Sequence, residues 1–116
     1  MALTLYGIKN CDTMKKARVW LEGQGIDYAF HDYKAVGIDE AHLKDWSVKV
    51  GWQVLLNKAG TTFKALSDAD KADIDEAKAI RLMIANPSMI KRPVLDKDGE
   101  IMVGFKADIY AKVFEA

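Results

Sequence analysis

The chain has 116 residues, half of them hydrophobic, and its seventeen Lys and Arg residues balance seventeen Asp and Glu residues. That length predicts one compact domain, because a chain of this size buries roughly two-thirds of the surface that it exposes when unfolded. The zero net charge offers no basic surface for nucleic acid or for an anionic membrane, and no apolar stretch approaches the ~20 residues that cross a bilayer.

The cysteine content limits the redox chemistry of the chain. A single cysteine, Cys11, excludes an internal disulfide and a cysteine-rich zinc site. The first residues, MALTLYGIKN, show no secretory signal. We therefore expect a cytoplasmic protein that binds neither nucleic acid nor a membrane.

A strand–helix–strand pattern opens the chain. Leu3 and Leu5 alternate with more polar residues and predict a strand. After a loop, apolar residues at helical spacing run to Gly23-Gln24-Gly25, and the alternation in IDYAFHDY (residues 26–33) predicts a second strand. Two strands joined by one helix within about thirty residues are typical of a parallel βαβ unit.

The middle of the chain is helical in pattern. Asp39 is a good N-cap for a helix that ends at Gly51, and short helical turns follow up to Leu66. Asp73 with Glu76 resembles a capping box for a longer helix that Asn86-Pro87 ends.

A hairpin and a helix close the chain. Two apolar runs flank Asp96-Lys97-Asp98-Gly99, and a helical pattern covers 106–114. This element order predicts an α/β, thioredoxin-like fold. We expect a four-stranded mixed sheet from residues near 3–7, 27–32, 93–96 and 101–104, in a core of 1–35 and 89–116 that carries a helical insertion over 36–88.

Cys11 is the candidate reactive group. It lies where a helix begins after a strand and a loop, and the free N–H groups at a helix N-terminus favour a thiolate. Lys9 and Lys15 add positive charge nearby, whereas Asp12 opposes it. The alternative is a buried structural cysteine, but the polar neighbours Asn10 and Thr13 indicate an accessible one.

Met14 restricts the mechanism. In Cys-x-x-Cys enzymes the second thiol stands one helical turn after the first, and here that position holds Met14. Any redox cycle must therefore be monothiol, with the second thiol supplied from outside. Glutathione is the abundant candidate.

The pair Arg92-Pro93 is the second candidate feature. In a thioredoxin-like fold, a proline that starts the third strand is commonly cis and faces the reactive cysteine, leaving backbone groups for an extended peptide. Arg92 offers a planar fork of donors for a carboxylate or an oxyanion. The alternative is an ordinary strand-initiating proline beside a surface arginine.

No metal site is indicated. His31 and His42 have no partners at ligand spacing. The acidic residues between Asp68 and Asp75 lack the glycine and the glutamate of a calcium loop, so helix caps explain them better.

Three segments together identify a family resemblance. TLYGIKNCDTMKKARVWLE (4–22), GWQVLLNKAGTTFKAL (51–66) and MIKRPVLDKDGEIMVGF (89–105) resemble the arsenate reductase (ArsC)-related family, most closely its small YffB-like branch. The resemblance covers nearly the whole chain. It implies a thioredoxin-like fold with a helical insertion and a cysteine thiolate that forms a mixed disulfide with glutathione, which glutaredoxin resolves.

The resemblance carries over unevenly to single residues. Cys11 matches the family nucleophile, and Arg92 matches an arginine that helps true arsenate reductases to bind the oxyanion. The resemblance places two further arginines where this chain has Asn57-Lys58 and Gly104-Phe105-Lys106. Without these planar forks a tetrahedral oxyanion is a poorer substrate, although Lys58 or Lys106 offers partial compensation.

We therefore expect a glutathione-dependent monothiol reductase. Cys11 is the nucleophile, and Lys9, Asn10, Thr13, Arg92 and Pro93 form the glutathione site. Glutathione is the co-substrate, without metal or organic cofactor, glutaredoxin is a candidate partner, and the substrate is an unidentified disulfide or oxyanion. The alternatives are a weak glutathione/glutaredoxin-dependent arsenate reductase and a non-catalytic, protein-binding regulator like the Spx branch, whose members usually carry Cys-x-x-Cys as a redox switch.

Overall fold

The computed structural model describes residues 3–115, which divide into two compact units. The sheet unit contains the described residues up to Ala35 and from Arg92 onward, and the helical unit is Val36–Lys91. Residues 89–91, which we expected with the sheet, belong to the helical unit. The reason is local pairing: Lys91 N donates to Leu55 O at 2.7 Å, and Ile90 forms an isolated antiparallel bridge with Leu56.

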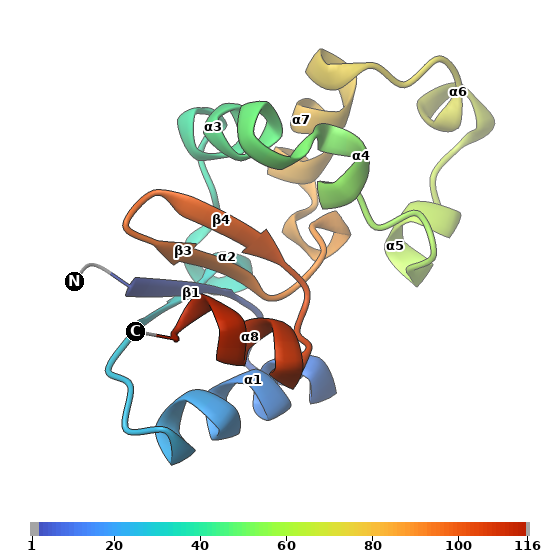
Figure 1. Cartoon of the computed structure of the whole chain (residues 1–116). Coiled ribbons are helices and arrows are strands. Elements are labelled where there is room, and N and C mark those ends of the chain that lie inside the picture. The colour runs from blue at the N-terminus through green and yellow to red at the C-terminus, as the bar shows by residue number, and fades with distance from the viewer. Residues whose placement is uncertain (1–2, 116) are drawn as a thin grey trace. The chain divides into compact units, whose positions relative to one another are not determined.

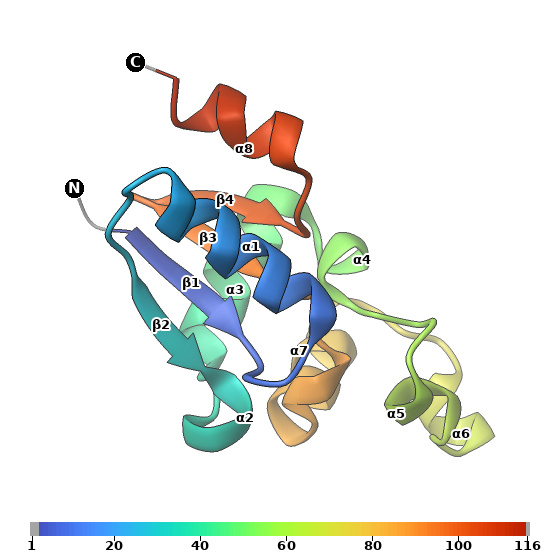
Figure 2. The ribbon, with the colours of Figure 1, turned by 90° about the horizontal axis from the view of Figure 1, so that it is seen from below.

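The sheet unit is built on four strands in the order β2-β1-β3-β4 (Figures 1 and 2). Their bounds are β1 Leu3–Gly7, β2 Ala29–Asp32, β3 Val94–Lys97 and β4 Glu100–Val103. β1 pairs in parallel with β2 and antiparallel with β3, and β3 pairs antiparallel with β4. This mixed sheet confirms the predicted α/β, thioredoxin-like fold. β2 begins two residues later than expected, because its ladder starts where Ala29 pairs with Thr4.

Two helices cover one face of this sheet (Figure 2). α1 (Asp12–Gly23) connects β1 to β2, and α8 (Ala107–Val113) follows β4. Their apolar side chains pack with those of β1 and β3 into one core, which contains Leu3, Leu5, Met14, Ala17, Leu21, Leu95 and Tyr110. The apolar residues at helical spacing in α1 face this core: Met14, Ala17 and Leu21 are fully buried, and Trp20 is half-buried against them.

The β3–β4 hairpin turns at Asp98-Gly99 as predicted. Both residues have positive φ, 51° and 92°, the conformation that a two-residue hairpin turn of this kind requires. The turn keeps β4 parallel in direction to β1, so the carboxyl ends of these two strands lie at the same edge of the sheet.

The helical unit contains α3 (Glu40–Val50), α4 (Trp52–Leu55), α5 (Thr61–Lys64), α6 (Asp68–Lys71), α7 (Glu76–Ala85) and the 3-10 helix η1 (Pro87–Met89). The short α2 (Tyr33–Val36) begins in the sheet unit and ends at the first residue of the helical unit. As expected, Asp39 caps α3 by accepting from His42 N, and none of the described residues 39–56 forms a strand. The predicted cap of α7 was wrong: Asp75 accepts from Lys78 N, whereas Asp73 has a φ of 50° in the preceding turn.

Among the described residues, no helix is both long and apolar enough to cross a bilayer.

Gly7 and Met14 fix how the start of α1 approaches β1. A Cβ built on Gly7 would collide with Met14 Sδ and Cε, and Met14 is fully buried. A close-packed core cannot shift far enough to make room for an added methyl group. We therefore expect Gly7→Ala to lower the free energy of unfolding by about 1–3 kcal/mol. Urea unfolding measures this loss.

Gly23→Ala is the matched control. Gly23 ends α1 with no atom within 4 Å of a built Cβ, so alanine should leave stability unchanged or raise it by up to ~1 kcal/mol. Equal losses in the two variants would contradict the packing explanation.

Candidate active site

Cys11 lies at the N-terminus of α1, as predicted. It is the N-cap residue, with extended backbone (φ −131°, ψ 133°), and its carbonyl accepts the first helical bond from Lys15 N at 2.9 Å. Its side chain is half-buried against the sheet-unit core rather than fully exposed. The thiol therefore has one side toward the core and one toward solvent.

Arg92 contacts this thiol from the other end of the sequence. Arg92 Nε donates to Cys11 Sγ at 3.4 Å, across 81 positions of the chain. The sheet explains the contact, because Val94 pairs with Tyr6 and Arg92 therefore precedes β3 at the edge where β1 ends. The Arg92–Pro93 bond is cis, which confirms the prediction for this bond.

The surroundings of Cys11 lower its pKa. Partial burial raises the pKa, but the backbone N–H of Met14, the Arg92 guanidinium and the backbone N–H of Thr13 together outweigh it. The two N–H groups do not form a capping hydrogen bond of standard geometry, and they act on the sulfur as the positive end of α1. The predicted cause, a helix N-terminus, is present, and Arg92 adds a charged donor.

A buried methionine occupies the position where a resolving cysteine would stand. Met14 follows Cys11 by three residues and is fully buried in the core of the sheet unit. Its side chain is directed at Gly7 and not toward solvent. Neither this position nor any other in the 116 residues supplies a second thiol.

Tyr33 is a site residue that the sequence analysis missed. It is fully buried at the start of α2, and its phenol is hydrogen-bonded to the Arg92 guanidinium. Burial raises the pKa of Tyr33, so the phenol stays neutral and accepts from Arg92. The sequence carried no signal for it, because its place follows from the register of the parallel ladder: Asp32 pairs with Gly7, so the next residue lies at the edge of the sheet that Cys11 occupies.

The other predicted glutathione-site residues are placed as follows. Thr13 is half-buried in the first turn of α1, and Pro93 is buried beside Arg92. Pro93 has no N–H, and its carbonyl already accepts from Gly104 N at 2.8 Å, so the expected free backbone for a peptide is not found at this residue. Lys9 and Asn10 are exposed in the loop before Cys11, and within residues 3–115 no hydrogen bond joins Lys9 to the thiol.

The positions of the two further family arginines lie in different units. Asn57 and Lys58 belong to the helical unit, where Asn57 N donates to Met89 O at 2.7 Å and Lys58 Nζ lies 5.9 Å from the centre of the Trp52 ring. Phe105 and Lys106 follow β4 in the sheet unit, and the Phe105 ring packs edge-on against Tyr110.

Comparisons with known proteins identify the relatives of this chain. The model of the ArsC family matches residues 6–113. A solved structure described as the YffB (PA3664) protein shares 63% sequence identity at a TM-score of 0.93, and the match covers 96% of this chain and 97% of that chain. An arsenate reductase (ArsC) related protein from Brucella melitensis shares 55% identity at a TM-score of 0.78, over 100% and 97%. The global transcriptional regulator Spx from Listeria innocua is 26% identical over 91% of this chain and 82% of its own length.

The lowered pKa of Cys11 predicts a pH dependence of both reactivity and stability. Alkylation by neutral iodoacetamide should titrate with a midpoint below ~8.5, the value of an unperturbed cysteine. In the window between the folded and unfolded pKa values, the unfolded chain binds more protons. The free energy of unfolding, relative to Cys11→Ser, should therefore rise with pH through this window and level off above ~8.5. A flat difference, or one that falls with pH, would contradict the thiolate assignment.

Tyr33→Phe tests whether the buried phenol positions Arg92. Loss of one hydrogen bond of ~0.5–1 kcal/mol should slow alkylation at neutral pH about two- to fivefold and move the midpoint toward the usual cysteine value. At a pH where both proteins are fully ionised the rates should converge, which a general loss of structure would not produce. The control is Tyr28→Phe, because Tyr28 accepts from Arg18 Nε at 2.9 Å and not from Arg92.

Proposed function

We propose a function that starts from one fact: this chain belongs to the ArsC family, whose model matches residues 6–113. The proposed activity is that of a glutathione-dependent monothiol reductase with Cys11 as the nucleophile. The observation that carries the proposal is the donor bond from Arg92 Nε to the sulfur of a cysteine that has no second thiol in the chain. A stabilised thiolate is the form that attacks a disulfide.

The proposed reaction consists of two thiol–disulfide exchange steps. The Cys11 thiolate attacks the glutathione sulfur of a mixed disulfide R–S–S–G, an S–S bond forms to Cys11, and R–S⁻ leaves with the electron pair and takes a proton from water. A second glutathione thiolate, or the thiol of glutaredoxin, then attacks the glutathione sulfur on Cys11. This step regenerates the Cys11 thiolate, so the substrate is reduced and the incoming thiol is oxidised.

The site is suited to a thiol that carries carboxylates. Arg92 uses Nε for the sulfur, and a guanidinium has four further N–H donors in a fixed plane. Another of these donors is hydrogen-bonded to Tyr33, and the Arg92 side chain is half-buried rather than fully enclosed. We assign Lys9, Asn10 and Thr13, which flank Cys11 in the sequence, to the same glutathione site together with Pro93.

Arsenate is a poorer candidate substrate. The resemblance places two further arginines at segments that here read Asn57-Lys58 and Gly104-Phe105-Lys106. An asparagine and a phenylalanine cannot supply a second and third bidentate cation for a tetrahedral oxyanion. Robust glutathione-coupled turnover of arsenate would contradict this part of the proposal.

The Spx match supports a second candidate, a protein-binding regulator without catalysis. It is favoured by the 91% coverage of this chain, and it is weakened by Met14, because a switch that closes an intrachain disulfide needs a cysteine there. A regulator of this kind does not require Cys11 to distinguish glutathione disulfide from other disulfides, so the selectivity of the thiol separates the two candidates.

Arg92→Ala tests the proposed function. Losing a charge-assisted hydrogen bond of ~1.5–3 kcal/mol should slow the reaction of Cys11 with glutathione disulfide by roughly one to two orders of magnitude. Because Arg92 also lowers the pKa of Cys11, each rate is divided by the rate with neutral bis(2-hydroxyethyl) disulfide at the same pH. Mass spectrometry of the mixed disulfide measures both rates.

Two further variants complete this experiment. Cys11→Ser should abolish modification, and Lys9→Ala should reduce the rate ratio less than Arg92→Ala does, because Arg92 offers a carboxylate a planar fork of N–H donors and Lys9 offers a single ammonium group. A wild-type ratio near one, or a ratio unchanged in Arg92→Ala, would overturn the assignment of glutathione to this site.

A further inference from the structure

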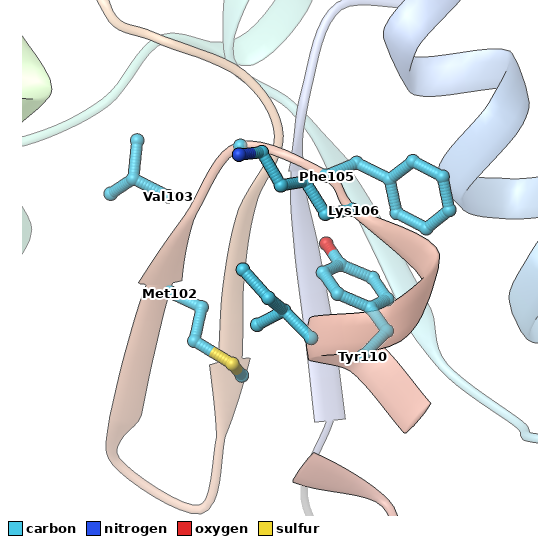
Figure 3. Close-up of a pocket in the computed structure, with 7 residues that line it drawn as sticks. Met102, Val103, Phe105, Lys106 and Tyr110 are labelled. Atoms are coloured by element: carbon cyan, nitrogen blue, oxygen red, sulfur yellow. The ribbon is translucent and has the colours of Figure 1, made fainter. Parts of the chain in front are cut away.

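An apolar pocket lies in the sheet unit on α1, where two residues after β4 pack beside this helix; we call it the α1 pocket. Its volume is about 420 Å³, large enough for a leucine or aromatic side chain. Val19 and Trp20 form one wall, and Phe105 and Ala107 form the other. In Figure 3, which shows the neighbouring pocket between β4 and α8, the Phe105 ring points away from Met102 and toward α1. An exposed apolar cluster of this kind marks an interaction site.

The α1 pocket begins one helical turn after the nucleophile. Lys15, which lines it, and Val19 follow Cys11 at four and eight residues, so the three lie along one face of α1. With a rise of about 1.5 Å per residue, the lining residues of α1 stand about 6–14 Å from Cys11 along the helix axis. An extended peptide advances about 3.3 Å per residue. A peptide held at Cys11 through its own cysteine therefore brings to the pocket a side chain two to four residues away.

Two lysines give the rim of the α1 pocket a positive charge. Its lining is almost wholly apolar, so Lys15 and Lys16 contribute their methylene stems and keep their ammonium groups in solvent. Within residues 3–115 neither ammonium forms an ion pair. Asp12, exposed in the first turn of α1, offsets only part of this charge. The pocket therefore suits an apolar side chain that has an acidic neighbour.

Glutathione does not supply the group that fills this pocket. A tripeptide of glutamate, cysteine and glycine has no large apolar side chain. The occupant therefore belongs to the other half of the mixed disulfide, the R group of R–S–S–G. An apolar group attached directly to the sulfur would be too close, because the pocket begins about 6 Å along α1 from Cys11. A polypeptide supplies the apolar side chain, its acidic neighbour and the required spacing together.

We propose that the α1 pocket recognises the protein half of the mixed disulfide, a polypeptide with a large apolar side chain two to four residues from its glutathionylated cysteine and an acidic residue beside that side chain. This inference rests on the proposed function and names its substrate class. The Cys11 thiolate forms the new S–S bond to the glutathione sulfur, and the bond between the glutathione and polypeptide sulfurs breaks. The polypeptide thiolate leaves with the electron pair and takes a proton from water.

The test uses synthetic peptides, each with one glutathionylated cysteine in a glycine–serine background. A single leucine is placed two, three, four or six residues from the cysteine on either side, and the reference peptide has serine there. Chromatography follows release of the peptide thiol by the full chain, with glutathione as the reductant. On one side of the cysteine, a leucine two to four residues away should raise kcat/KM about tenfold, as expected from its partial burial. A leucine six residues away should have no effect.

Val19→Ser and Val48→Ser form a matched pair of variants. Both valines are exposed, 69% and 83%, and only Val19 lines the pocket. Val19→Ser should lower the preference for the best leucine peptide about three- to fivefold and leave the rate with the serine peptide unchanged. Val48→Ser should leave both rates unchanged. The ratio of the two peptides cancels any change in the reactivity of the thiol.

Lys16→Glu tests the charge at the rim. In the wild type, a glutamate beside the leucine should raise the rate about two- to threefold at low salt, and added salt should remove this gain. Lys16→Glu should reverse the preference, so that a lysine beside the leucine gives the faster peptide. A wild-type rate that is the same with glutamate and with lysine would overturn the acidic part of the proposal.

The outcomes also separate this inference from the proposed function. Equal rates for the leucine and serine peptides, or a leucine preference that persists in Val19→Ser, overturn the pocket whether or not Cys11 prefers glutathione. The mixed disulfide of glutathione and hexanethiol, if it reacts as fast as the best peptide, overturns the polypeptide as occupant. A leucine preference that remains, at an equal rate, when 2-hydroxyethanethiol replaces glutathione in the peptides keeps the pocket and overturns the glutathione-dependent reductase.

Discussion

The antiparallel pairing of β1 with β3 is the constraint on which the site depends. Cys11 follows β1 and Arg92 precedes β3, so the register that pairs Tyr6 with Val94 brings the sulfur and the guanidinium together at one edge of the sheet. A shift of this register by one residue would move Arg92 and also turn the apolar side of β3 away from α1. Correct packing of the core and correct chemistry at the thiol therefore require the same alignment of strands.

The protonation state of the Cys11 thiol results from two opposing electrostatic effects. Burial against the core disfavours the charged sulfur, and the N–H groups of α1 and the Arg92 guanidinium favour it more strongly. Arg92 is itself held by the neutral phenol of Tyr33, so the donor faces the sulfur from a fixed position. A chain of three groups thus reaches from the buried Tyr33 at the start of α2, through Arg92 before β3, to the half-buried Cys11 at the start of α1.

The sequence analysis succeeded where the pattern is local. The strand end and the helix start that place Cys11 lie in one short stretch of sequence. The hairpin could likewise be predicted, because two strand patterns flank the turn residues Asp98-Gly99 directly. It missed features that depend on pairing between distant segments. The role of Tyr33 requires the β1–β2 register, and the α1 pocket exists only because Phe105 and Ala107 lie beside that helix.

The burial of Met14 has a consequence for how long an oxidised form of this chain persists. A neighbouring thiol in the same chain would release a bound group in a first-order step whose rate is set by geometry. Here the site of that neighbour is filled by a core side chain, so every disulfide formed at Cys11 is intermolecular and ends only when another molecule collides with it. The lifetime of the oxidised form is then inversely proportional to the concentration of free thiol around the protein.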